Sequence, residues 1–349
     1  MGIEVSSFGT LSDGTEVKLF VLGNSHGMRL ELIDLGACIT RLYALDVQGR
    51  LRDVVVGLDC AESYLDNPCT IGAAVGRSAN RIGRARFTLD GVEYALGVNN
   101  NANNVHSGPD FWFQRMWRAT VDESRNAVTL HLDSPDGDQG FPGAASVDVT
   151  YMLSENDEVI VEYAVDPTAK TVINMTQHSY FNLNGHNTGS ILDHMLQIDA
   201  DRYTEVDSEL IPTGALPSVE GTAMDFREPH RIGARIGAPE ARIAEFGGYD
   251  HNMCFSTPCG EVRRTITLVG DESGIVMDVL TDTPGVQLYI GNTLHEARGK
   301  DGVSYGPHDA LCLETQFYPD AINHADWPQP VFGPEHPYRS RTVFAFSTR

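Results

Sequence analysis

The chain has 349 residues, of which 41% are hydrophobic and 21% charged, and its formal net charge is −23 at pH 7. These proportions are typical of a globular protein with a sizeable core. The acidic excess argues against nucleic acid or an anionic membrane as a partner, because both select clusters of Lys and Arg. A neutral small molecule fits this charge best. No run reaches the roughly 20 apolar residues that span a bilayer.

The cysteines predict neither a zinc ribbon nor a disulfide framework. All six are scattered along the chain, and no C-x-x-C pair occurs. The first residues show neither the basic nor the apolar part of a signal peptide. We therefore expect reduced thiols and a cytoplasmic location.

Short runs of partly alternating polarity, separated by Gly, Asn and Asp, favour antiparallel strands. The clearest runs cover residues 16–22, 28–34, 39–47, 112–117, 128–132 and 147–152. Helical candidates are short, at residues 62–65 and 240–246. Residues 23–27 match the G-x-S-x-G of a hydrolase elbow, but that elbow needs a helix after it and a strand pattern follows. No linker divides the chain, so we predict one all-β domain over residues 1–349.

The stretch of residues 171–184 reads TVINMTQHSYFNLN and contains the first candidate for chemistry. Alternate side chains of an extended chain share a face. One face then carries Asn174, Thr176, His178, Tyr180 and Asn182, and the other is mostly apolar. This pattern predicts a strand on the floor of a polar cleft, with an imidazole that exchanges protons near neutral pH. The structural alternative is a core histidine with a satisfied hydrogen bond.

Other polar groups occur where the backbone is expected to turn. The small-residue run at 71–82 ends in Asn80 and Arg81, which together offer a fork of donors to hydroxyl oxygens. The segment 99–108, NNNANNVHSG, is rich in Asn and must be a loop, and it contains His106. Two glycines precede Asp250 and place it on a bent backbone. The structural alternative for each of these groups is an ordinary solvated surface residue.

Two late strand patterns carry further candidates. In residues 286–290, Gln287 and Tyr289 share a face, and in residues 311–317 Cys312, Glu314 and Gln316 do so. A Glu within an apolar strand is costly unless it is paired or functional. Glu314 is therefore the most conspicuous carboxylate, with a buried structural ion pair as the alternative.

A Glu and a His without a nucleophile or cofactor motif favour general acid–base catalysis. Near neutral pH an ordinary carboxylate is ionised and an imidazole can be protonated, so one group can accept a proton while the other donates one. No H-x-H or H-E-x-x-H occurs, so we predict no metal, and no phosphate- or dinucleotide-binding glycine motif is present. Amides, Arg and Asp suit hydroxyl groups, which indicates a sugar.

Seven segments in order resemble the signature segments of the aldose 1-epimerases (galactose mutarotases). They are GRSANRI, NNVHSG, SPDGDQGFPG, TQHSYFNLNG, GGYDHN, TPGVQLYIGN and CLETQFYPDA. The resemblance implies a single-domain β-supersandwich of large antiparallel sheets with an open sugar cleft. It further implies that Glu314 is the general base for the anomeric hydroxyl and His178 the general acid for the ring oxygen. The expected reaction opens and recloses the ring of a neutral aldose without a cofactor or metal.

By the same resemblance, six residues would bind and orient the sugar, with His106 near the ring oxygen. They are Asn80, Arg81, His106, Tyr180, Asp250 and Gln287. Two features depart from the family pattern: Gln177 stands where Asn is expected, on the face away from His178, and residues 107–110 read SGPD. Two alternatives remain, a hexose-6-phosphate 1-epimerase and a carbohydrate-binding protein without catalysis. The preferred sugar and the oligomeric state are not predicted.

Overall fold

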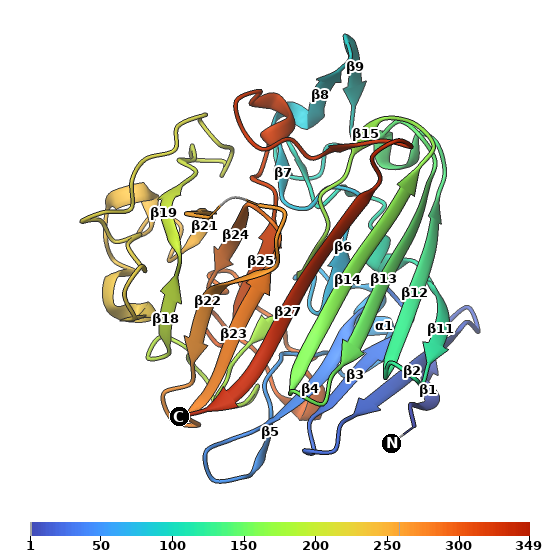
Figure 1. The fold of residues 1–349 in the computed structure, drawn as a ribbon, viewed down its shortest axis with the longest axis vertical. Helices are drawn as coiled ribbons and strands as arrows, with labels where there is room; N and C mark the ends of the chain where they lie inside the picture. Colours follow the sequence, from blue (N-terminus) through green and yellow to red (C-terminus); the bar gives the residue numbers. More distant parts are fainter. Residues whose placement is uncertain (1, 258) are drawn as a thin grey trace.

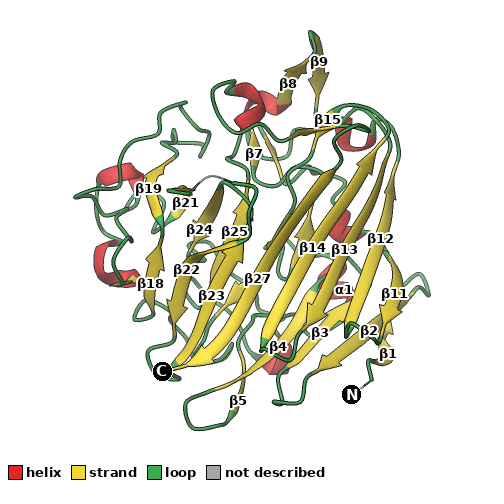
Figure 2. Cartoon of the chain, viewed as in Figure 1, coloured by secondary structure: helices red, strands yellow, loops and turns green. Residues whose placement is uncertain are grey.

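The computed structural model describes residues 2–257 and 259–349, and strands dominate it (Figure 2). The largest sheet has nine antiparallel strands, and the long C-terminal β27 (Tyr338–Thr348) lies between β14 (Glu158–Pro167) and β23 (Ile275–Thr281) (Figure 1). The other strands of this sheet are β11 (Arg118–Asp122), β12 (Ala127–Ser134), β13 (Ala145–Leu153), β22 (Arg263–Val269), β18 (Met195–Ile198) and β20 (His230–Arg231).

Two five-stranded sheets complete the framework. The N-terminal meander contains β1 (Glu4–Thr10), β2 (Glu16–Gly23), β3 (Arg29–Ile33), β4 (Ile39–Leu45) and β5 (Leu51–Asp53). The other sheet contains, in spatial order, β17 (Tyr180–Phe181), β25 (Leu311–Gln316), β24 (Gly285–Tyr289), β21 (Asp250–Phe255) and β19 (Ala200–Tyr203).

One apolar core joins all three sheets. The burial of β13 alternates strictly along its nine residues, so one face of the strand points inward. Val149 on this face belongs to the same buried cluster as Leu30 of β3 and Leu313 of β25. Sheets that share a core in this way form a sandwich. The predicted class, an all-β fold of large antiparallel sheets with few short helices, is confirmed.

Short elements connect the sheets. The remaining strands form four two-stranded pairs: β6 (Ala73–Val75) with β16 (Thr176–His178), β7 (Arg81–Ile82) with β10 (Asn104–Val105), β8 (Arg86–Leu89) with β9 (Val92–Ala95), and β15 (Thr171–Val172) with β26 (Val331–Phe332). The only α-helix in the described part of the chain, α1 (Ala61–Leu65), confirms the helical candidate at 62–65. Among the described residues, no helix is both long and apolar enough to cross a membrane.

Two local predictions are wrong. Residues 240–246 form only a 3₁₀ turn at Glu240–Arg242, because the carbonyl of Ala241 turns to accept a hydrogen bond from His251 Nε2 over 2.7 Å. The expected strand at 112–117 is also a 3₁₀ turn, Trp112–Gln114. Here the indole N–H of Trp117 donates to the carbonyl of Trp112, which folds the segment back on itself.

The stretch 171–184 is not one continuous strand. It divides into β15, β16 and β17, because each piece pairs with a different partner, β26, β6 and β25. The predicted alternation of faces survives at the centre, where His178 lines a cleft. Gln177 instead faces the core, where it accepts a hydrogen bond from the Tyr151 hydroxyl over 2.7 Å and donates to the Gly72 carbonyl over 2.6 Å.

Candidate active site

A polar cleft of about 730 Å³ brings together residues that are far apart in the chain. Seven of the eight predicted site residues line it: Asn80, Arg81, His106, His178, Tyr180, Asp250 and Glu314. The eighth, Gln287, lies beside the cleft on β24 and donates its amide N–H to Asp250 Oδ1 over 2.6 Å. The structure therefore places all eight residues in one assembly.

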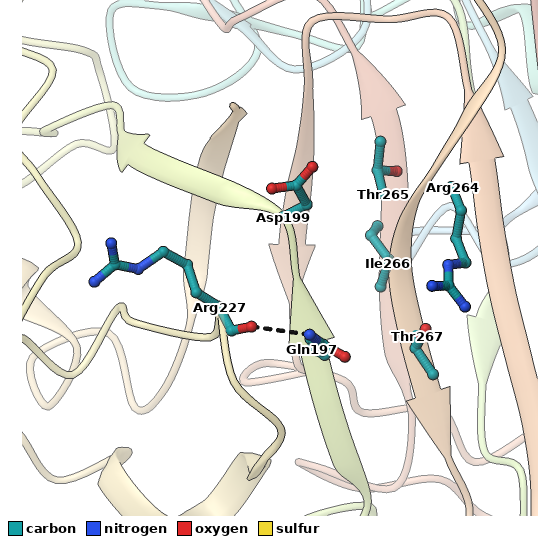
Figure 3. A pocket seen from close by; sticks show the side chains of 7 residues that line it. All are labelled: Gln197, Asp199, Arg227, Arg264, Thr265, Ile266 and Thr267. Carbon is teal, nitrogen blue, oxygen red and sulfur yellow. Dashed lines mark hydrogen bonds between the residues drawn. The ribbon is translucent and has the colours of Figure 1, made fainter. Parts of the chain in front are cut away.

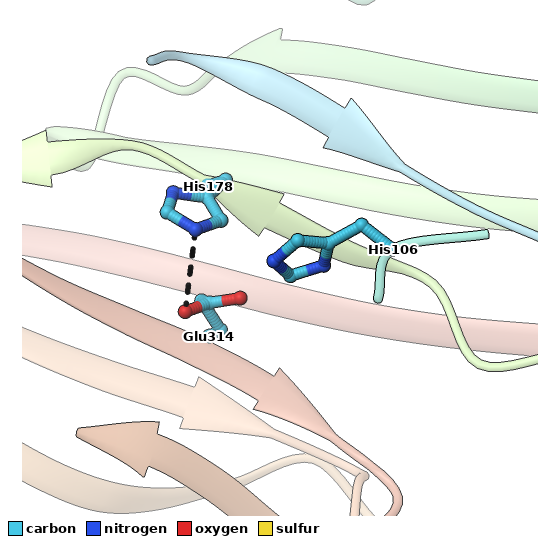
Figure 4. Close-up of side chains that lie close together, drawn as sticks. All are labelled: His106, His178 and Glu314. Atoms are coloured by element: carbon cyan, nitrogen blue, oxygen red, sulfur yellow. Dashed lines mark ion pairs between the residues drawn. The ribbon is translucent and has the colours of Figure 1, made fainter. Parts of the chain in front are cut away.

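Glu314 and His178 face each other in this cleft (Figure 4). His178 Nε2 lies 3.6 Å from Glu314 Oε1, and both side chains are buried. The other carboxylate oxygen, Oε2, has no hydrogen-bond partner among the described residues. A buried carboxylate whose only ion-pair partner in the described part of the chain is an imidazole does not fit the structural alternative of a stable buried ion pair. It fits a group held ready for a ligand.

The pKa values of this pair are shifted in opposite directions. Burial raises the pKa of Glu314 to about 8, with a further increase from Asp250 and an opposing effect of Arg81. Burial lowers the pKa of His178 to about 4, although its own backbone and Asp250 act in the opposite direction. Removal from water disfavours the charged form of both groups. The two pKa values therefore stand in the reverse of the order expected for ordinary Glu and His side chains. At neutral pH the pair binds one proton.

His106 is held in a defined tautomer. Its backbone N–H donates to the Asn80 carbonyl over 2.9 Å, and the Asn80 N–H donates to His106 Nδ1 over 3.2 Å. A backbone N–H can only donate, so Nδ1 must accept and the proton of the neutral imidazole must be on Nε2. Burial, His178 and Arg81 lower the pKa of His106 well below its usual value, so the ring is neutral. His106 is thus a neutral N–H donor, packed edge-on 5.3 Å from the His178 ring.

The hydrogen bond from the Asn80 N–H to His106 Nδ1 also bears on whether His106, His178 and Glu314 suit a metal ion. His106, His178 and Glu314 each offer a ligand atom, and these atoms lie within 4.8 Å of one another. Two histidines and a carboxylate are a known ligand set for zinc. However, a metal needs an unprotonated ring nitrogen, and in His106 Nδ1 is occupied by the Asn80 N–H while Nε2 carries the proton. The donor set fits a hydrogen-bonded ligand better than a metal.

The loops that carry Asn80 and His106 are locked together at their bases. The Ser107 hydroxyl accepts from the Ser78 N–H over 2.8 Å and donates to the Ser78 carbonyl over 2.9 Å. Ser107 belongs to the segment that departs from the family pattern, and here it joins the two loops. Close packing also holds this region, since a Cβ at Gly76 would lie 2.3 Å from the Trp112 ring. The small residues of the run at 71–82 permit this close packing.

One signature segment, residues 134–143, supports the site without lining the cleft. The buried guanidinium of Arg77 donates to the carbonyls of Pro142 and Gly143 over 3.0 and 2.8 Å. The Arg77 N–H donates to Gln139 Oε1 over 3.1 Å. This segment therefore anchors the start of the loop that continues to Asn80.

Some polar groups on the cleft wall already form hydrogen bonds within the protein. Arg81 Nε donates to Asn100 Oδ1 over 3.3 Å, which orients the guanidinium along the wall. The Tyr180 hydroxyl donates to the Cys69 carbonyl over 2.9 Å, while its ring packs 5.2 Å from that of His178. Tyr180 therefore offers a ring face more than a hydroxyl. Sequence reasoning missed Asn100 as a cleft residue, and its position in the predicted Asn-rich loop was the available signal.

Several other cleft residues were not predicted. They are Pro68, Cys69, Thr70, Val105, Leu210, Glu245, Phe246, Tyr289, Asn292, Thr293 and His295. Tyr289 could have been found, because strand alternation places it on the face of Gln287. Val105 lies on β10, and the others come from loops and turns whose approach to the cleft depends on tertiary contacts.

A second hollow lies on the nine-stranded sheet, over β18 and β22 (Figure 3). Its volume is about 250 Å³, and Gln197 on its floor donates to the Arg227 carbonyl over 2.9 Å. The residues that line it include one carboxylate, Asp199, and no histidine. It lacks the paired proton donor and acceptor of the larger cleft.

A sandwich of large antiparallel sheets with a buried Glu–His pair in a polar cleft defines an acid–base enzyme of the β-supersandwich class. Comparison with known proteins agrees. The family profile "Aldose 1-epimerase" matches residues 18–345. Galactose mutarotase from Bos taurus is 41% identical over 342 residues, covering 97% of each chain. Aldose 1-epimerase from Escherichia coli (strain K12) is 33% identical over 336 residues, covering 96% of each chain.

Solved structures show the same fold. The GalM/aldose epimerase homologue from C. elegans superposes with a TM-score of 0.85 at 27% identity, covering 95% of this chain and 98% of that chain. The chain belongs to the aldose 1-epimerase family, and it is an isomerase-type enzyme.

Proposed function

We propose that this protein interconverts the α and β anomers of a free neutral aldose such as galactose or glucose. The observation that carries the proposal is the facing pair of Glu314 and His178 in a cleft lined by hydrogen-bonding groups. Ring opening and closing need only proton transfers, for which one acceptor and one donor suffice. The names of the relatives, galactose mutarotase and aldose 1-epimerase, support the same activity.

The single proton bound by the Glu314–His178 pair suits a reversible reaction. At neutral pH the single proton of the pair lies on Glu314, and the reacting form is the one in which this proton has moved to His178 Nε2. In that form the Glu314 carboxylate takes the proton of the anomeric hydroxyl, while the His178 imidazolium donates its Nε2 proton to the ring oxygen. The bond between C1 and the ring oxygen breaks and the open-chain aldehyde forms. Rotation about C1–C2 presents the other carbonyl face, and the reverse transfers close the ring as the other anomer. The pair holds one proton before and after each step.

The remaining groups are proposed to bind and orient the sugar. His106 would donate its Nε2–H near the ring oxygen and so polarise the bond that breaks, and the Asn80 N–H at Nδ1 supports this by leaving the proton on Nε2. Arg81 and Asn80 offer donors to hydroxyl oxygens. Asp250, fixed by Gln287, offers an acceptor, so donors and acceptors both border the cleft.

The charge around the cleft disfavours a hexose 6-phosphate. Among the described residues that line it, Arg81 is the only Arg or Lys, whereas Glu245, Asp250 and Glu314 are carboxylic acids. Phosphate recognition favours clustered cations. We therefore expect galactose 6-phosphate to be turned over with a kcat/KM at least about tenfold below that of galactose. Equal or better turnover of the phosphate would favour the alternative.

Residues 1–349 are proposed to act as one domain in the cytoplasm. The proposed site residues come from segments between Asn80 and Glu314, which are far apart in the chain. The nine-stranded sheet also pairs β14 directly with the C-terminal β27, so distant segments share one sheet. All six cysteines are free thiols, which suits a reducing compartment.

The direct test follows freshly dissolved α-galactose by polarimetry or NMR. The wild-type protein should equilibrate the anomers faster than buffer, and Glu314→Gln and His178→Asn should each lose about 10²- to 10⁴-fold in kcat. Matched controls are Glu162→Gln and His131→Asn, whose side chains pair with Arg125 and Asp148 on the nine-stranded sheet.

Two outcomes would contradict the proposal at different levels. A wild type no faster than buffer would overturn the activity and favour a carbohydrate-binding protein without catalysis. Full activity in Glu314→Gln would overturn the base assignment while leaving the activity in place.

A further inference from the structure

The polar neighbours of His178 on its own stretch do not orient the imidazole. Asn174 bridges to the backbone of Phe317, accepting its N–H over 2.9 Å and donating to its carbonyl over 3.2 Å. Asn182 donates to two other backbone carbonyls, and Thr176 Oγ1 has no partner among the described residues. Besides the backbone of His178 itself, the side chain that reaches Nδ1 is Cys312, whose Sγ lies 3.5 Å from this nitrogen.

Cys312 and Glu314 belong to the same strand, and each faces one of the two ring nitrogens of His178. They stand two residues apart on β25, so strand alternation puts both side chains on the face toward His178. Glu314 Oε1 faces Nε2, and Cys312 Sγ faces Nδ1. Cys312 also pairs in register with Tyr180 of β17, two residues after His178, which fixes the position of the thiol relative to the ring.

We propose that Cys312 is a positioning residue that accepts the Nδ1–H of His178 and so keeps Nε2 as the nitrogen that exchanges protons. This inference rests on the proposed function of the Glu314–His178 pair. If Nδ1 holds a fixed proton, the bare Nε2 faces Glu314 and the mobile proton passes on that side of the ring. The opposite tautomer would place a fixed proton on Nε2, and Glu314 could not then return its proton there.

A thiol has a specific chemical consequence in this position. Sulfur is a weak acceptor, so it fixes the tautomer without stabilising the imidazolium as strongly as a carboxylate would. Burial raises the pKa of the Cys312 thiol well above its usual value, so it stays neutral. A neutral, soft partner is compatible with an imidazole that must release its proton readily to the sugar.

The first test reads the tautomer directly. ¹⁵N NMR of the histidine-labelled protein at pH 6 distinguishes Nδ1–H from Nε2–H, and comparison with His178→Asn assigns the signal among the 12 histidines. Wild type should show the proton of His178 on Nδ1, and Cys312→Ala should show a mixture of tautomers. A wild-type proton on Nε2 would overturn the inference. This measurement needs no activity, so its failure is distinguishable from failure of the proposed function.

The second test separates positioning from packing. Cys312→Ala should lower kcat for galactose about three- to tenfold with KM unchanged, which corresponds to the loss of one ordinary hydrogen bond. Cys312→Ser, which restores an acceptor, should recover most of this loss. Cys38→Ala is the matched control, since that thiol is equally buried in the same apolar cluster as Cys312. An unchanged kcat in Cys312→Ala, or a Ser variant as slow as Ala, would overturn the inference.

Discussion

His178 and Glu314 lie 3.6 Å apart although they belong to different sheets, His178 to the β6–β16 pair and Glu314 to the five-stranded sheet of β25. The cleft therefore forms where two sheets meet, and each sheet contributes one of the two proposed proton-transfer groups. Because both side chains are buried on strands that pair with neighbours, the structure defines their separation without a bound sugar. Such preorganisation lowers the cost of reaching the transition state.

The shifted pKa values of this pair predict the pH dependence of kcat. Below pH about 4 the pair binds two protons and has no base, and above pH about 8 it binds none and has no acid. Activity should therefore be flat between these values and fall about tenfold per pH unit outside them. Polarimetric rates, corrected for the buffer reaction, give the profile. A single limb near the ordinary histidine pKa would contradict the assignment.

His106 should act as a neutral hydrogen-bond donor. Replacement by Ala removes the Nε2–H and should lower kcat/KM about 10²-fold, as for the loss of one donor to a developing charge. His106→Gln, whose amide can donate, should recover part of the loss. The acid limb of the pH profile should not move, because His106 is proposed to act as a neutral donor and burial lowers its pKa well below the usual value. Steady-state kinetics of the three proteins decide the point, and a shifted acid limb would show that His106 is the titrating group.

Removal of metal ions should not affect catalysis. The Asn80 N–H occupies His106 Nδ1, so the three-residue cluster is a poor ligand set. Dialysis against EDTA followed by assay in metal-free buffer should leave kcat unchanged. A loss that zinc alone restores would contradict this view of the site.

Gln287 should affect substrate binding more than the chemical step. Gln287→Leu removes the donor that fixes Asp250 over 2.6 Å and should raise KM about three- to tenfold with a smaller change in kcat. Gln197→Leu, on β18 of the nine-stranded sheet (Figure 3), is the matched control. A fall in kcat with unchanged KM would assign Gln287 a role in the reaction itself.

Close packing of Gly76 against Trp112, beneath the loop that carries Asn80, should make the protein less stable when a side chain is added at Gly76. In Gly76→Ala the added Cβ would lie 2.3 Å from the Trp112 ring, and we expect a loss of about 1–3 kcal/mol in the free energy of unfolding. Urea denaturation measures this loss. Gly237→Ala, with no heavy atom within 4 Å, should have little effect. Equal stabilities of the two variants would show that the ring can move aside.

The sequence by itself determined the strand-rich class and supplied the candidate site residues. Alternation on β25 placed Glu314 in an apolar strand, where an unpaired carboxylate is costly, and alternation placed Gln177 away from His178. These inferences depend only on the two-residue period of a strand. The seven ordered segments then identified the family, which comparison confirmed.

Only the tertiary structure decided how these residues work. The division of residues 171–184 into three strands follows from three separate partners, and the pKa values of Glu314 and His178 follow from burial. The tautomer of His106 depends on a backbone N–H 26 residues away in the chain, and the thiol beside His178 is 134 residues away. Desolvation and hydrogen-bond direction arise from neighbours brought together by folding, and no local pattern encodes them.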